Sequence, residues 1–106
     1  MKIINVKDRF PCPGPRYKKL GTGSGEEFRE WIIRELKHDP ELTINLDGTI
    51  GYGSSFLEES FGGLIRENIS EKTVKAIKLI SEEEPDLIDE INEYIDDAIS
   101  EKNGES

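Results

Sequence analysis

Residues 42–65 read LTINLDGTIGYGSSFLEESFGGLI, and they join an apolar strand to an amphipathic helix through a glycine-rich turn. Leu42, Ile44 and Leu46 alternate with polar residues, which is typical of a strand with one buried face. A strand that enters a helix through such a turn presents free backbone N–H groups and the positive end of a helix dipole. We therefore expect the functional edge of the protein in this stretch.

Two hydroxyls stand at the start of the predicted helix, which should run from about Ser55 to Ile69. Ser55 and Glu58 have the spacing of a capping box, so Ser55 has a structural explanation. Ser54 is then a spare hydroxyl on the exposed turn, and its phosphorylation would add about −1.5 to −2 charges. The helix dipole would favour that charge, whereas Glu58 and Glu59 would oppose it. Both serines are phosphorylation candidates on this edge, and its expected partner-binding residues are Gly51, Tyr52, Gly53, Phe56, Glu58 and Glu59.

Two glycines, Gly62 and Gly63, lie inside the same predicted helix. Each costs about 1 kcal/mol relative to alanine in a helix interior. Such a cost indicates that something packs close to the backbone there. The sheet is the favoured neighbour, and a partner protein is the alternative.

The N-terminal segment favours a hairpin. Ile3, Ile4 and Val6 are β-branched and predict a strand that could continue to Phe10. The prolines of PCPGP, residues 11–15, should end it. Residues 16–20 would then return as a second strand.

A second glycine-rich loop, GTGSG at residues 21–25, leads into another predicted helix that ends before Pro40. Ser24 and Glu27 form a capping box at its start. A flexible capped helix start is the simpler interpretation, because Glu26 and Glu27 would repel phosphate. Anion or nucleotide binding is the alternative, and its candidate residues are Thr22, Gly23, Ser24 and Gly25.

The C-terminal part predicts one more strand and one more helix. Residues 74–80 favour a short buried strand over a helix, because Ser81 and Glu84 supply another capping box directly afterwards. The last helix has an apolar stripe from Leu87 to Ile99 and an acidic opposite face. The order β-β-α-β-α-β-α indicates an α/β fold with helices over a mixed sheet. We expect a single domain over 1–100 and a disordered acidic tail over 101–106.

Charge and composition limit the classes of partner. Residues 1–53 carry 9 basic and 8 acidic residues, whereas residues 54–106 carry 5 and 15, so the net charges are +1 and −10. An acidic second half disfavours nucleic acid and anionic membranes and favours a basic protein partner. Cys12 is the only cysteine, and neither a membrane span nor a signal-peptide core is apparent. These features predict a cytoplasmic protein.

The sequence contains little material for catalysis. His38 is the only histidine, so a metal site or a serine–histidine–aspartate triad is not expected. NLDGT at residues 45–49 resembles the first motif of haloacid-dehalogenase-type phosphatases, but Asn45 stands where that family has its nucleophilic aspartate. We expect no enzyme activity, no catalytic residue, no metal and no cofactor.

Two blocks, GPRYKKLGTGSGEEFREWI at 14–32 and LDGTIGYGSSFLEESFGGLI at 46–65, resemble the STAS-like domain family, which is related to anti-sigma-factor antagonists. The resemblance implies a mixed four- to five-stranded sheet with helices packed mainly on one face. In the antagonists, a serine at a helix start is phosphorylated by a partner with a histidine-kinase-like ATPase fold, and Ser54 matches that serine. Gly53 replaces the family aspartate and Phe56 replaces a glycine.

The preferred functional hypothesis is a non-enzymatic regulatory module that binds a protein partner through the strand–turn–helix edge 51–59, with Ser54 as a phosphorylation switch. A histidine-kinase-like ATPase is the first partner to consider. The alternative is a small-ligand or nucleotide sensor that uses the glycine-rich loops 21–25 and 47–53. A structural subunit that oligomerises through its helices is a third interpretation, and the sequence leaves the oligomeric state open.

Overall fold

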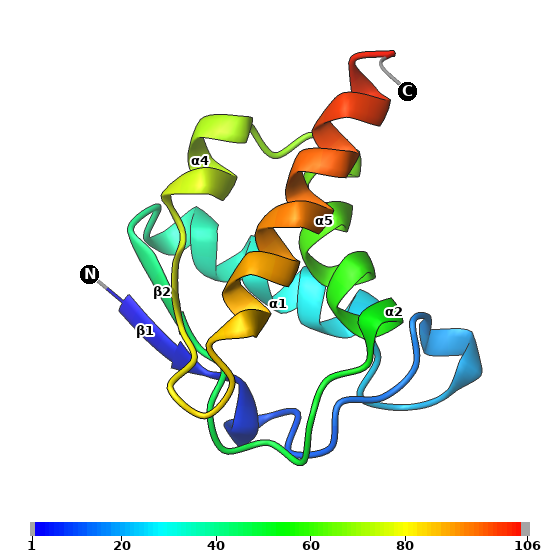
Figure 1. The fold of residues 1–106 in the computed structure, drawn as a ribbon, viewed down its shortest axis with the longest axis vertical. Helices are drawn as coiled ribbons and strands as arrows, with labels where there is room; N and C mark the ends of the chain where they lie inside the picture. The colour runs from blue at the N-terminus through cyan, green and yellow to red at the C-terminus, as the bar shows by residue number, and fades with distance from the viewer. Residues whose placement is uncertain (1, 105–106) are drawn as a thin grey trace.

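A three-stranded parallel sheet forms one side of the molecule, in a computed structural model that describes residues 2–104 (Figure 1). The strands are β1 (Lys2–Asn5), β2 (Leu42–Asn45) and β3 (Lys78–Ile80), with β2 in the centre. Ile4 pairs with Ile44, which pairs with Leu79 on the other side. Ile4 and Ile44 are buried, whereas Ile3 on the opposite face is 52% exposed. The helices therefore pack on one face of the sheet.

The helices connect the strands and cover that face. They are α1 (Gly25–His38), α2 (Ser54–Leu57), η3 (Glu58–Gly62), α3 (Gly63–Arg66), α4 (Glu71–Ala76) and α5 (Asp86–Lys102). Two 3-10 turns, η1 (Val6–Asp8) and η2 (Lys18–Leu20), lie in the N-terminal segment. The elements α2, η3 and α3 follow one another without a break, and η3 is a π-helical segment. We call residues 54–66 the central helix.

The central helix is the middle of the hydrophobic core, because both α1 and α5 pack against its π-helical segment. Phe28 of α1 stacks on Phe56 with 5.5 Å between ring centroids, and Phe61 meets Phe28 edge-on at 5.7 Å. Phe10 adds a fourth ring, 5.5 Å from Phe28. Burial of each such side chain contributes about 1.5–3 kcal/mol. This aromatic cluster ties the start of the central helix to α1 and to the N-terminal segment.

The predicted hairpin is wrong, and residues 16–20 do not form a strand. The carbonyl oxygen of Pro15 accepts a hydrogen bond from the Gly25 N–H at 2.9 Å, and that of Arg16 accepts one from the Glu26 N–H at 3.0 Å. The segment is therefore used to cap α1 and does not pair with β1. Among residues 2–104 the sheet has three parallel strands, where the sequence predicted a mixed sheet of four or five.

The C-terminal part of the structure differs from the sequence-based predictions in three places. The predicted strand at 74–80 is divided, because α4 extends to Ala76 and β3 comprises only Lys78–Ile80. The Ser81 hydroxyl donates to the Glu84 carbonyl at 2.5 Å, and α5 begins later, at Asp86. α5 also continues to Lys102, so the predicted disordered tail begins inside a helix. Residues 105–106 of that tail lie outside the described residues.

Candidate functional site

The loop that follows β2 is fixed at its base by hydrogen bonds to the neighbouring β3–α5 turn. The Leu46 N–H donates to the Ile80 carbonyl at 2.8 Å. The Asp47 carboxylate accepts from the N–H groups of Glu82 and Glu83 at 3.1 and 3.0 Å. The Tyr52 hydroxyl donates to the Leu46 carbonyl at 2.7 Å, and burial raises the pKa of Tyr52 to about 12. The loop is therefore held in place before it reaches the central helix.

An apolar side chain projects from the tip of this loop. Ile50 is 83% exposed, although its own N–H donates to the Pro11 carbonyl at 3.0 Å. In Figure 1 this loop runs beside the N-terminal segment at the lower edge of the molecule. Ile50 therefore presents an apolar side chain to solvent from a loop whose backbone is hydrogen-bonded to the rest of the fold. The sequence analysis missed Ile50, whose only signal is an apolar residue between the loop glycines Gly48 and Gly51.

The two helix starts differ in how their N–H groups are satisfied. In α1, Gly25 and Glu26 donate to the 15–16 segment, while Glu27 donates to the Ser24 hydroxyl at 3.1 Å and Phe28 to the Ser24 carbonyl at 3.1 Å. The capping box residue Ser24 is thus confirmed as the cap of α1. The N–H groups of Gly25, Glu26 and Glu27, which have no acceptor within α1, are thus all occupied. Of the residues predicted to bind an anion, Gly25 therefore has no free N–H group to offer.

The central helix starts without a cap. It begins at Ser54, one residue earlier than predicted, and its N-cap is Gly53, which has no side chain to accept a hydrogen bond. The predicted role of Ser55 as a cap is therefore wrong. Within residues 2–104, the N–H groups of Ser54, Ser55 and Phe56 have no hydrogen-bond acceptor, whereas Leu57 donates to the Gly53 carbonyl. Ser54 and Ser55 are both exposed.

Tyr94 of α5 is a polar neighbour of Ser54. The Tyr94 hydroxyl donates to the Glu90 carboxylate at 2.5 Å. This hydrogen bond, together with burial, raises the pKa of Tyr94 to about 12, and the nearby Ser54 side chain opposes the shift slightly. Ser54 therefore lies close to Tyr94 of α5.

Three arginines surround the two glutamates that follow the helix start. Arg16 lies 2.5 Å from Glu58 and 3.2 Å from Glu59, and Arg66 lies 2.7 Å from Glu58. Arg29 pairs with Glu59, whose side chain is 8% exposed. We call these five residues the arginine cluster, and its net charge is +1, from three positive and two negative groups. No local sequence pattern predicts the cluster, because Arg16 and Arg29 are distant from the two glutamates along the chain.

The glycine pair lies against side chains of the arginine cluster. A Cβ on Gly62 would lie 2.6 Å from a Glu58 oxygen, and one on Gly63 would lie 2.8 Å from Cδ of Arg29. The expected neighbour was the sheet or a partner, but it is this set of ion pairs. Burial opposes ionisation of Glu58, yet hydrogen bonds from Arg66 and Arg16 outweigh burial and lower its pKa.

The predicted partner-binding residues do not all reach the surface. Gly53 is exposed, and Gly51 and Tyr52 are half-buried. Phe56 is completely buried in the aromatic cluster, and Glu59 is 6% exposed. These two residues cannot contact a partner directly in this conformation. The accessible part of the edge is therefore Ile50 to Ser55.

Residues 2–104 contain no group of three or more histidine, cysteine, aspartate or glutamate side chains arranged to hold a metal ion. No helix within the same residues is long and apolar enough to cross a bilayer.

A family model described as a STAS-like domain of unknown function matches residues 24–87. The matched segment extends from the cap of α1 into the first turn of α5. It includes the starts of α1 and of the central helix, and the strands β2 and β3. The chain belongs to this STAS-like family, which confirms the resemblance seen in the sequence. It matches no curated protein and no solved structure at a significant level.

Proposed function

We propose that this STAS-like domain is a non-enzymatic regulatory module that binds a protein partner through the edge formed by Ile50 to Ser55. One observation carries the proposal: an uncapped helix start with two exposed hydroxyls begins four residues after an 83% exposed isoleucine, whose backbone N–H is hydrogen-bonded to Pro11. The isoleucine offers an apolar anchor, and the free N–H groups offer donors to a partner or to a phosphate.

Ser54 is the proposed switch on this edge. A phosphate on its Oγ would add about −1.5 to −2 charges at the positive end of the central helix, beside N–H groups that lack acceptors. Glu58 and Glu59 would oppose that charge if they were unpaired, but the arginine cluster neutralises both. Glu90 of α5 remains as a nearby negative group. The hydrated phosphate would then displace a partner that docks on Ile50.

A protein with a histidine-kinase-like ATPase fold is the proposed partner and kinase, on the basis of the family resemblance. In this reaction the γ-phosphoryl group of ATP is transferred to the Ser54 oxygen, ADP leaves, and the hydroxyl proton is released. The acidic outer face of α5 favours a partner with a basic surface around its docking site.

Affinity capture from the source cells tests both parts of this proposal. Tagged wild-type protein and Ser54→Ala should retain the same partner, whereas Ser54→Glu should lose it. Purified partner with ATP should then phosphorylate the wild type at Ser54, located by mass spectrometry, but not Ser54→Ala. Equal capture of the partner by all three proteins would contradict the phosphorylation switch. If the wild type and Ser54→Ala capture no partner in common, the proposal of a protein-binding module is contradicted.

A further inference from the structure

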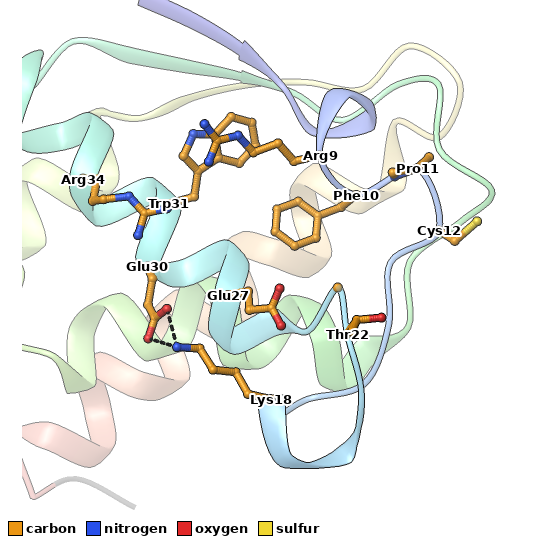
Figure 2. Close-up of a pocket in the computed structure, with 11 residues that line it drawn as sticks. Arg9, Phe10, Pro11, Cys12, Lys18, Thr22, Glu27, Glu30, Trp31 and Arg34 are labelled. Carbon is orange, nitrogen blue, oxygen red and sulfur yellow. Dashed lines mark hydrogen bonds and ion pairs between the residues drawn. The ribbon is translucent and has the colours of Figure 1, made fainter.

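A cavity of about 670 Å³ lies on the far side of α1 from the central helix, outside the proposed docking edge (Figure 2). Its walls are the segment from Arg9 to Cys12, Thr22 and Gly23 of the glycine-rich loop, and the outer face of α1. Its volume is within the range of small-molecule sites, roughly 300–1,000 Å³. The loop at 47–53, which the sensor hypothesis also invoked, does not line it.

The charges that line the cavity are separated along α1. Glu27 is in the first turn and Arg34 is seven residues later, which places them about 10.5 Å apart along the helix axis at 1.5 Å per residue. Arg9 adds a second positive group near the Arg34 end, where its guanidinium lies 4.6 Å from the centre of the Trp31 ring. The cavity therefore has an acidic end and a basic end.

These charges are available to a ligand. Among residues 2–104, none of Glu27, Arg9 and Arg34 forms a salt bridge with another side chain. The remaining two charged groups on the wall, Lys18 and Glu30, neutralise each other at 2.7 Å. Figure 2 shows this ion pair at the side of the cavity, with the Glu27 carboxylate directed toward its centre.

The middle of the cavity is aromatic. The exposed edges of Phe10 and Trp31, 6% of each residue, lie between the charged ends, and the Arg9 guanidinium lies over the Trp31 ring. A ligand complementary to this arrangement has a cationic end, an apolar centre and an anionic end about 10 Å away. A nucleotide does not satisfy this order, because its phosphates would suit Arg9 and Arg34 but leave Glu27 without a counter-charge.

We propose that the cavity binds a free, extended peptide of about three residues. Three extended residues span roughly 10 Å. The N-terminal ammonium pairs with Glu27, the C-terminal carboxylate pairs with Arg34 and Arg9, and the central side chain contacts the exposed edges of Phe10 and Trp31. The cavity adjoins the docking edge at Pro11 but is lined by none of the residues 50–55, so either proposal can fail while the other stands.

The chain carries two natural reporters for the test, because Trp31 and Cys12 line the cavity and each is the only residue of its type. Alanyl-leucyl-alanine should change the Trp31 fluorescence with saturation and slow the alkylation of Cys12 by iodoacetamide. The N-acetylated and the C-amidated forms of this peptide should each bind at least tenfold more weakly, because each lacks one terminal charge.

Substitutions at Glu27 and Arg34 test which end of the peptide each residue binds. Glu27→Gln should weaken binding of the free peptide and abolish its advantage over the acetylated form, and Arg34→Gln should do the same for the amidated form. Lys37→Gln, on the same helix but outside the cavity, should bind as the wild type does. Equal binding of free and capped peptides, or no saturation by the free peptide up to millimolar concentration, would overturn the proposal. Preferential saturation by ATP or ADP would overturn it as well and would favour the nucleotide alternative.

Discussion

Gly25, the first residue of α1, lies directly against the backbone of Phe56 in the first turn of the central helix. A Cβ on Gly25 would be 2.6 Å from the Phe56 carbonyl oxygen and 3.1 Å from its Cα. The buried Ser60 hydroxyl joins the same two residues, since its oxygen lies 3.0 Å from the Gly25 carbonyl and 2.7 Å from the Phe56 carbonyl. The capped helix start therefore holds the uncapped one in position.

Substitution of Gly25 should disturb this contact. Because the opposing atoms belong to backbone, Gly25→Ala should lower the free energy of unfolding by about 1–3 kcal/mol, the usual cost of overpacking. Gly53→Ala is the matched control, since no atom lies within 4 Å of its added Cβ and its φ of −80° suits alanine. Urea unfolding measures both, and equal stabilities of the two variants would contradict the close approach.

The arginine cluster should make the protein sensitive to acid. The pKa of Glu58 is lowered in the folded state, so its contribution to stability is present above about pH 4.5 and is lost as the pH falls through the folded pKa. Glu58→Gln should therefore be less stable than the wild type at pH 7, and the difference in melting temperature should shrink toward pH 3. Arg66→Gln, which removes one of two arginine partners, should be intermediate. A difference in melting temperature between wild type and Glu58→Gln that does not change between pH 7 and pH 3 would show that the ionised Glu58 contributes nothing to stability.

Tyr52 should produce a loss of stability at alkaline pH. Its folded pKa is raised to about 12, so above about pH 10 the unfolded chain loses the phenolic proton first and stability falls as the pH rises. Tyr52→Phe removes this effect and also the hydrogen bond to Leu46, which costs about 1 kcal/mol at neutral pH. Thermal unfolding at pH 8 and pH 11 tests this, and an unchanged alkaline slope in Tyr52→Phe would contradict it.

The sequence predicted those features that depend on neighbours along the chain. The alternation of Leu42 and Ile44 located the central strand, and the Ser24–Glu27 spacing located the start of α1. The capping pattern failed at Ser55 because Glu58, its expected partner, is bound by two arginines. Local pattern could not show that competition.

The features that depend on tertiary contact could not be predicted. Arg16, Arg29 and Arg66 meet only because α1, the central helix and the 15–18 segment pack together. The glycine pair was correctly identified as a close approach, but its neighbour was not, since the sequence does not show which side chains cross it. Likewise, Ile50 is exposed only because its loop is fixed to Pro11 and β3. The sequence therefore predicts the helix start and its serines. The exposure of Ile50 and the pairing of Glu58 and Glu59 with arginines become apparent only from the fold.

The affinity of the captured partner for two surface variants tests the central claim most directly. Ile50→Ser removes the exposed apolar anchor, and Leu20→Ser makes the same kind of change at a 64% exposed residue of η2, away from the edge. Measured by calorimetry, Ile50→Ser should weaken binding at least tenfold, which is 1.4 kcal/mol, while Leu20→Ser should stay within about twofold of the wild type. Wild-type affinity for Ile50→Ser, or an equal loss in both variants, would contradict docking through the Ile50 to Ser55 edge.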